Sequence, residues 1–331
     1  MTTTHLSPQT GMYPARIGRI RKLASDILEL EVELEQGDAP SRPVYSAGAH
    51  VDLHLPNGQV RQYSLVSSCD ERHYRVAVAL SPISRGGSAY IHAHLQAGQV
   101  VQVSEPRNNF PLRDCRDHAV LIAGGIGITP IWSMVQELER RGQRWTLYYC
   151  ARTAQQAAFL APLQALLASS AQGELITVFD HEPRQSPLAL ERVFEAHGRQ
   201  ARYYCCGPAG MLDGFLAAAQ RAGVPTERAH IERFAASPVC GQENIGFEVE
   251  LRNGAIHQVA GHQSILDVLI EAGLNPMYSC KEGICGSCET RVLEGTPDHR
   301  DSLLSQQEHA SNKTMLICVS RCKDSRLVLD I

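Results

Sequence analysis

Four cysteines in the last quarter of the chain have the type and spacing of an iron-sulfur site. Cys280, Cys285 and Cys288 are separated by four and by two residues, and Cys318 follows after twenty-nine more. A close triplet with one remote partner is the ligand spacing of plant-type 2Fe-2S clusters, which take four thiolates. Structural zinc sites more often use two close pairs, so zinc is the weaker interpretation. The spacing therefore predicts a 2Fe-2S cluster, a group that moves one electron at a time.

The fourth ligand has two candidates, because Cys322 lies four residues after Cys318. Cys318 belongs to the apolar run MLICV, which can enter a core, whereas Cys322 stands between Arg321 and Lys323. Cys318 is therefore the predicted ligand.

Short strands and one helix surround these cysteines. The stretch GFEVELRNGAIHQVA alternates as a hairpin around Asn253-Gly254, and SILDVLIEAGL has the apolar period of a helix that ends at a glycine. A further strand, RLVLDI, follows at residues 326–331. This order predicts a ferredoxin domain of the plant type, with a β-grasp fold, over residues 246–331.

A glycine-rich loop in the middle of the chain is a candidate phosphate site. HAVLIAGGIGITPIW predicts a buried strand, a loop and a helix, with Thr129 at the N-cap and Pro130 at the first helical position. Gly124, Gly125 and Gly127 would let a phosphate approach the helix N–H groups, which favour an anion. A tight turn without ligand is the alternative, because the loop lacks the third glycine of the dinucleotide fingerprint.

Strand candidates separated by helical stretches continue from this loop to about residue 234. They are RWTLYYCAR, ELITVFD, ARYYCCGP and AHIERF. This alternation predicts a doubly wound α/β nucleotide domain with a parallel sheet over residues 114–234. Ligands of such sheets bind at the carboxyl ends of the strands, where the glycine loop and Cys206-Gly207-Pro208 would both lie.

The first 113 residues predict an antiparallel β-barrel of the Greek-key type. Stretches such as ILELEVELE, AHVDLHL and YRVAVAL alternate between Pro and Gly residues, and no long helix is evident. RQYS at 61–64 combines a cation, an aromatic ring and a hydroxyl, and SRGGS at 84–88 could form a phosphate-sized nest. Taken alone, each is more often an ordinary strand or turn.

Length, charge and hydropathy exclude several classes of protein. The 331 residues are too many for one core, and we divide them into domains at 1–113, 114–234 and 246–331 with a linker at 235–245. A formal charge of -4 argues against general affinity for nucleic acid, and no run of about 18 apolar residues predicts a membrane span. An odd count of eleven cysteines, without a signal peptide, predicts reduced thiols in a cytoplasmic protein.

Taken in order, the motifs resemble those of the ferredoxin-NADP reductase superfamily. Within it the chain is most similar to the reductase components of Rieske-type aromatic oxygenases, in the group of phthalate dioxygenase reductase and vanillate demethylase reductase. The resemblance covers residues 14–331, and its markers are RQYS at 61–64, RGGS at 85–88, PRNNFPL at 106–112, GGIGITP at 124–130, CCGP at 205–208, ERF ending at 234 and the ferredoxin segment.

The resemblance implies a flavin site in the barrel. Arg61 would hold the flavin phosphate, with Gly87 and Ser88 completing the nest. Tyr63 would pack on the isoalloxazine ring, and Ser64 would hydrogen-bond near N5, where hydride arrives. In this group the flavin is FMN, whereas many relatives use FAD.

The resemblance also implies an NADH site. Cys206 and Phe234 would border the place where nicotinamide and flavin stack, so Ser64, Cys206 and Phe234 form the expected catalytic group. Asp180 would contact the adenine-side ribose, in keeping with NADH, although Arg152 could instead accommodate a 2′-phosphate. The residues implied for binding the pyrophosphate are Gly124, Gly125, Gly127, Thr129, Gly207 and Pro208.

The implied activity is electron transfer from NADH through FMN to the 2Fe-2S cluster, and then to the Rieske centre of a partner aromatic-ring dioxygenase or O-demethylase. From Phe247 onward the chain has twelve acidic and eight basic residues. We therefore expect transient docking through the acidic ferredoxin domain of a monomer. Two alternatives remain open: a flavin reductase that releases reduced flavin, and a redox sensor or zinc-binding module that uses the four cysteines.

Overall fold

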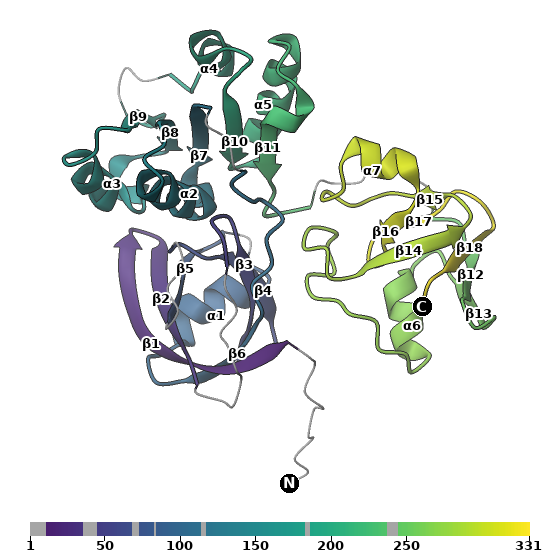
Figure 1. Cartoon of the computed structure of the whole chain (residues 1–331). Coiled ribbons are helices and arrows are strands. Elements are labelled where there is room, and N and C mark those ends of the chain that lie inside the picture. Colours follow the sequence, from purple (N-terminus) through teal and green to yellow (C-terminus); the bar gives the residue numbers. More distant parts are fainter. Residues whose placement is uncertain are drawn as a thin grey trace. The chain divides into compact units, whose positions relative to one another are not determined.

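The computed structural model, drawn in Figure 1, describes residues 11–35, 45–67, 73–82, 84–113, 117–182, 186–236 and 244–331. The chain divides into two compact units, Met1–Glu232 and Arg233–Ile331. Most of the predicted linker, residues 235–245, lies outside the described residues. Among the helices that are described, none is long and apolar enough to cross a membrane.

The first unit begins with an antiparallel barrel of six strands in the order β4-β3-β6-β1-β2-β5. A bridge between Leu65 and Val76 joins the end of β4 to β5 and closes the barrel. Alternate residues of β2, such as Leu30 and Val32, point into the core, as the alternation predicts. The strands are β1 (Met12–Ala24), β2 (Ile27–Leu34), β3 (His50–His54), β4 (Val60–Ser64), β5 (His73–Ala79) and β6 (Val100–Ser104).

The barrel also contains a short helix, α1 (Gly87–His94), that the sequence did not reveal. Its only fully buried large apolar side chain is Ile91, which joins the barrel core, so the segment has little helical periodicity. The last two residues of the predicted nest at 84–88 are therefore the start of a helix.

The second half of the first unit is a parallel sheet in the order β11-β10-β7-β8-β9. All six residues of the central strand β7 are buried, as expected for a strand covered on both faces. Two separate core clusters, one including residues of α2 and the other residues of α4 and α5, lie on the sheet and confirm the doubly wound fold.

The strands of this sheet are β7 (Ala119–Gly124), β8 (Trp145–Ala151), β9 (Gly173–Phe179), β10 (Arg202–Cys206) and β11 (Ala229–Glu232). The helices are α2 (Ile128–Arg140), α3 (Leu160–Leu167), α4 (Leu190–His197) and α5 (Ala209–Arg221), with the 3-10 turns η1 (Gly125–Gly127), η2 (Ala154–Gln156) and η3 (Thr226–Arg228).

The predicted N-cap of α2 is wrong by two residues. The helix begins at Ile128 with Gly127 before it, so Thr129 is its second residue. The Thr129 hydroxyl donates to Ile126 O at 3.0 Å instead of accepting a hydrogen bond from the helix. Because the 3-10 turn η1 leads directly into the helix, no side chain is needed as a cap.

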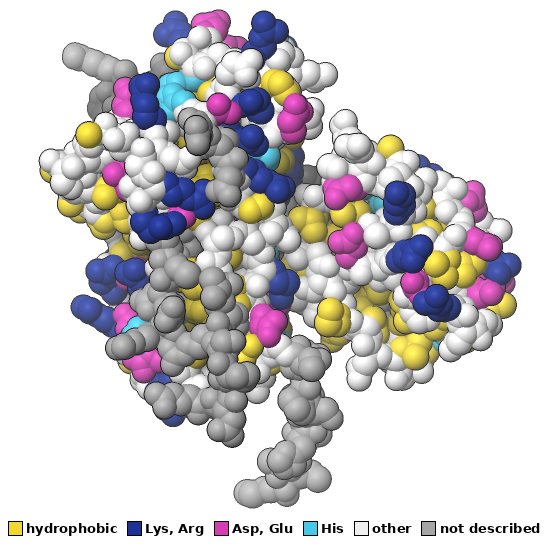
Figure 2. Space-filling view, viewed as in Figure 1, with side chains coloured by type: hydrophobic (Ala, Val, Ile, Leu, Met, Phe, Trp, Pro, Cys, Tyr) yellow, Lys and Arg dark blue, Asp and Glu magenta, His cyan; other side chains and the backbone are white. Residues whose placement is uncertain are grey.

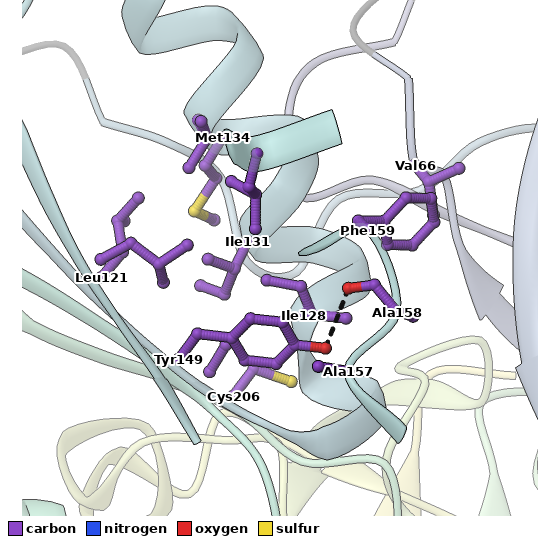
Figure 3. Close-up of a cluster of buried hydrophobic side chains, with 14 of the residues drawn as sticks. Val66, Leu121, Ile128, Ile131, Met134, Tyr149, Ala157, Ala158, Phe159 and Cys206 are labelled. Atoms are coloured by element: carbon purple, nitrogen blue, oxygen red, sulfur yellow. Dashed lines mark hydrogen bonds between the residues drawn. The ribbon is translucent and has the colours of Figure 1, made fainter. Parts of the chain in front are cut away.

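Helix α2 also joins the barrel to the nucleotide sheet. Its Ile131 and Val135 belong to one buried cluster with Val66 of the barrel, and part of this cluster is shown in Figure 3. Ser133 Oγ accepts a hydrogen bond from Gly48 N at 3.1 Å, and Gln136 Nε2 donates to Val66 O at 2.8 Å. The barrel and the parallel sheet therefore pack as one body.

The second unit is a five-stranded sheet in the order β13-β12-β18-β14-β16, with the pair β15-β17 beside it. Strands β12 and β18 are parallel and the other pairs are antiparallel, and Ile265, Leu266 and Leu269 of α6 lie in its core. The predicted β-grasp fold is confirmed.

The elements of the second unit are β12 (Phe247–Leu251), β13 (Ile256–Val259), α6 (Ile265–Glu271), β14 (Glu289–Glu294), β15 (Pro297–Asp298), α7 (Gln306–Ser311), β16 (Thr314–Leu316), β17 (Arg321–Cys322) and β18 (Arg326–Leu329).

Candidate functional site

Arg61 and the first turn of α1 form a cationic cradle on the barrel. Arg61 Nη2 donates to Arg85 O at 2.8 Å and to Gln59 Oε1 at 2.7 Å. A Cβ atom on Gly87 would lie 2.7 Å from Arg61 Cγ and Nε, so glycine lets the guanidinium lie against the helix. First-turn N–H groups, including that of Ser88, have no intrahelical acceptor and favour an anion. The cradle fits a phosphate.

Tyr63 and Ser64 follow Arg61 along β4. Tyr63 packs against the barrel core, and burial raises the pKa of its phenol, which therefore stays neutral. Ser64 is 5% exposed, and within the described part of the chain its Oγ has no hydrogen-bond partner. A buried hydroxyl without a partner is unfavourable, so this oxygen is suited to a ligand atom such as a flavin nitrogen.

The structure brings the two predicted nucleotide loops together at the carboxyl ends of β7 and β10. A Cβ atom on Gly124 would lie 2.7 Å from Pro208 Cδ, and one on Gly127 would lie 2.1 Å from Cys206 O. Gly207 is also close, since its Cβ would lie 3.1 Å from Gly124 Cα. The glycines are thus required for the loops to touch, and Gly125, with φ 55°, makes the turn between them and the helix.

Cys206 is fully buried at the end of β10. Burial raises the pKa of its thiol far above the usual range, and Glu232 and Cys205 add to this, so the thiol is neutral. A neutral thiol is a weak hydrogen-bond donor rather than a nucleophile. The residue is therefore suited to positioning a ring and not to covalent chemistry.

Glu232 is a residue of this site that the sequence analysis missed. It is paired in register with Cys206 across β10 and β11, and its buried Oε2 has no hydrogen-bond partner among the described residues. Burial raises the pKa of this carboxyl to about 8, so it is protonated and can donate at neutral pH. The available signal was its place in the ERF motif at the carboxyl end of a strand.

Asp180 and Phe234 lie at less enclosed positions. Asp180 directly follows β9, and its N–H donates to Ala151 O at 3.2 Å, while His181 N donates to Arg152 O at 3.0 Å. Asp180 and Arg152 therefore share the carboxyl edge of the sheet where a ribose would bind. Phe234 is 41% exposed and belongs to the second unit, two residues after β11.

The four predicted iron ligands lie together in the second unit. Cys285, Cys288 and Cys318 are buried, and Cys280 is partly buried. Hydrogen bonds from the thiols of Cys285 and Cys318 lower the pKa of Cys280. Cys318 likewise lowers the pKa of Cys288 through a side-chain hydrogen bond. This is the mutual proximity that a shared metal cluster needs, because thiolates are its ligands.

Backbone N–H groups also point at these sulfurs. Glu282 N donates to Cys280 Sγ at 3.3 Å and Cys280 N donates to Cys285 Sγ at 3.5 Å, as expected around an iron-sulfur cluster. Cys322 faces elsewhere, because its Sγ lies 3.5 Å from Arg326 O. The arrangement fits a 2Fe-2S cluster on the four predicted cysteines, whose individual roles stay a prediction.

Two family models match parts of the chain. The 2Fe-2S iron-sulfur cluster binding domain matches residues 249–323, and the oxidoreductase NAD-binding domain matches residues 121–216. The chain is 41% identical over 322 residues to the vanillate O-demethylase oxidoreductase of a Pseudomonas species, covering 97% of this chain and 100% of the relative.

Two solved structures are similar over nearly the whole chain. Phthalate dioxygenase reductase is 35% identical with a TM-score of 0.68, and the match covers 97% of this chain and 98% of that one. An intact type IV self-sufficient cytochrome P450 monooxygenase is 30% identical with a TM-score of 0.86 over 99% of this chain. The present chain spans only 43% of that P450 chain.

Proposed function

The chain belongs to the family of iron-sulfur flavoprotein reductases that includes vanillate O-demethylase oxidoreductase and phthalate dioxygenase reductase, and we propose that it docks transiently with a Rieske-type terminal oxygenase. It is an NADH oxidoreductase that uses FMN and a 2Fe-2S cluster and serves as the reductase of an oxygenase system. We further propose that it is a cytoplasmic monomer with domains at 1–113, 114–234 and 246–331.

This proposal rests mainly on one observation: the chain contains both a cluster of four neighbouring cysteines and the Arg61–Gly87 cradle. When bound, the flavin accepts hydride from NADH and passes on single electrons, and the cluster carries those electrons to the acceptor. A flavin reductase would not explain the four cysteines, and a redox sensor would not explain the Arg61–Gly87 cradle.

The protein's own residues bind and orient these groups. Arg61, Gly87 and Ser88 hold the flavin phosphate, and Tyr63 covers the ring. Ser64 donates to a ring nitrogen, which holds the reacting edge in one place. The buried carboxyl of Glu232 and the thiol of Cys206 line the nicotinamide position and exclude water from it.

Residues that bind NADH lie at the carboxyl edge of the parallel sheet. The N–H groups of η1, at the start of α2 beside Thr129, face the pyrophosphate, and Gly207 and Pro208 close the other side. Asp180 accepts from the adenine-side ribose, while the role implied for Phe234 stays a prediction.

Docking is proposed to be electrostatic. The segment from Phe247 has a net charge of -4, from twelve acidic and eight basic residues, and the cluster adds negative charge when bound. Figure 2 shows both acidic and basic side chains on the visible face of the second unit. The proposed attraction therefore comes from the net negative charge of the segment. A basic surface on the oxygenase would be attracted, and the attraction falls as salt is added.

The test is an anaerobic titration of the purified protein with NADH, followed by absorbance. The wild-type protein should lose both the flavin and the iron-sulfur absorption. Cys318→Ser should bind FMN and reduce it but lack the cluster, and it should fail to reduce a Rieske oxygenase. Cys322→Ser is the matched control and should behave as wild type. Acceptor reduction that survives Cys318→Ser would favour the flavin reductase instead.

A second acceptor deserves the same test because of the similarity to a P450 monooxygenase. Reduced protein is mixed with a Rieske oxygenase and, separately, with a haem P450, over a range of salt concentrations. Rapid, salt-sensitive reduction of the Rieske centre alone supports the proposal. Preferential reduction of the haem, or rates that do not change with salt, would contradict it.

A further inference from the structure

A second group of ionisable side chains lies in the ferredoxin unit, apart from the four cysteines. His299 and Asp301 come from the segment after β15, and His309 comes from α7. The Asp301 side chain is 0% exposed, with its Oδ1 3.1 Å from His309 Nε2 and 3.8 Å from His299 Nδ1. The two imidazole rings stack, with centroids 4.4 Å apart and planes within 16°. We call these three residues the histidine pair group.

Three N–H groups donate to the buried carboxylate. Asp301 Oδ2 accepts from Leu303 N at 3.2 Å and from Leu304 N at 2.7 Å, and Oδ1 accepts from His309 Nε2. With a hydrogen on Nε2 that donates to Asp301 Oδ1, Nδ1 is the nitrogen of the His309 ring that is left to accept a proton. The group therefore places a proton-accepting nitrogen beside a buried carboxyl.

The histidine pair group is attached to the cysteine set on two sides. Ser302 N donates to Gly283 O at 2.9 Å, and Gly283 lies in the loop between the first two cysteines. Arg300 N donates to Ser320 Oγ at 3.3 Å, and Ser320 lies two residues after the fourth cysteine. A Cβ atom on Gly283 would lie 3.0 Å from Asp301 Cα, so the two segments are in direct contact.

Only one of the stacked rings is suited to carry the proton. Burial lowers the pKa of His299, and charge on His309 lowers it further. Asn312 and Asp301 act in the opposite direction on His299, and Lys323 again lowers its pKa. The side chain of His299 is 6% exposed, while that of His309 is 29% exposed and can exchange protons with water.

The surroundings of His309 are mainly acidic. It faces Asp301 directly, and its charge interacts with Glu308 in the same helix. Histidine is the side chain type whose charge most commonly changes near neutral pH. A metal ion is a poorer occupant, because nearly parallel stacked rings cannot direct their in-plane lone pairs at one point.

We propose that the histidine pair group takes up one proton when the 2Fe-2S cluster is reduced, so that the cluster's reduction potential depends on pH. The electron comes from the reduced flavin and stays on the cluster, and the proton comes from water and binds Nδ1 of His309. The added negative charge on the cluster is thus matched by one positive charge on the imidazole. The proposal rests on the proposed function only in requiring that the cluster is present.

The test is a dye-mediated redox titration of the full-length holoprotein from pH 5.5 to 8.5, with the reduced cluster counted by electron paramagnetic resonance. For wild type, the equilibrium constant for one-electron reduction should fall about tenfold per pH unit over part of this range, which is about 59 mV. His309→Gln retains a donor to Asp301 and should remove the pH dependence. His262→Gln changes an exposed histidine of the same unit and should retain it.

Asp301→Asn is a second variant, which keeps the test valid if His309→Gln does not fold. Asp301→Asn removes the buried negative charge, so the cluster should be easier to reduce at every pH, with a smaller pH dependence. A wild-type constant that changes less than twofold across the range overturns the inference, as does unchanged pH dependence in His309→Gln. Absence of the cluster signal from wild type would instead contradict the proposed function, and the inference with it.

Discussion

Replacing Gly87 by Ala tests how the flavin phosphate is held. The added Cβ would lie 2.7 Å from Cγ and Nε of Arg61, so the arginine must move away from the first turn of α1. A hydrogen bond to a charged group contributes about 1.5–3 kcal/mol, and losing one should weaken FMN binding about 10- to 150-fold. Folding should not suffer, because alanine is favoured over glycine in a helix by about 1 kcal/mol.

The assay is titration of apoprotein with FMN, followed by quenching of flavin fluorescence. Gly214→Ala is the matched control, since Gly214 lies in α5 and its Cβ would meet only Leu190 Cδ1, at 3.4 Å. In an Arg61→Ala background, Gly87→Ala should have no further effect. An unchanged FMN affinity, or an equal loss in that background, would refute this account of the cradle.

Three further changes have expected outcomes. Ser64→Ala should stabilise the apoprotein by about 1 kcal/mol in urea unfolding, because it removes a buried hydroxyl without a partner, yet it should slow flavin reduction by NADH about tenfold in stopped flow. Gly127→Ala should destabilise the protein by about 3 kcal/mol in the same unfolding assay, since its Cβ would lie 2.1 Å from Cys206 O. Glu232 has a folded pKa of about 8 against 4.5 in the unfolded chain, so the folded state binds more protons between these values and stability falls as pH rises. Unfolding at pH 6 and 8 should show a loss of about 2 kcal/mol in wild type that is absent in Glu232→Gln, and equal pH dependence in both would contradict the assignment.

The sequence was most informative where chemistry depends on local spacing. The cysteine loop and the glycine loops could be located because a few neighbouring residues determine each of them. The strands of the barrel and of the parallel sheet were also predictable, because alternation and apolar runs are properties of single segments.

Features that depend on distant contacts were not predictable. Helix α1 buries one large apolar side chain, Ile91, and lies beside Arg61, and neither feature gives a periodic pattern. The role of Glu232 depends on its pairing with Cys206 across two strands, β10 and β11, that are separated in sequence by helix α5. The start of α2 was misplaced because η1 continues directly into it, which leaves Thr129 inside the helix.

The double role of α2 determines how this chain can be recombined with its relatives. One end of the helix is proposed to bind the nucleotide, and its sides are shared between the barrel and the sheet through Ile131, Val135 and the Gly48–Ser133 hydrogen bond. A chimera joined near residue 113 would therefore pair the barrel of one protein with the helix α2 of another. Their contact surfaces would not be complementary, and apolar side chains between them would be exposed. A chimera joined near residue 233 respects the division of the chain, so exchange of the electron-delivery module is the recombination that folding permits.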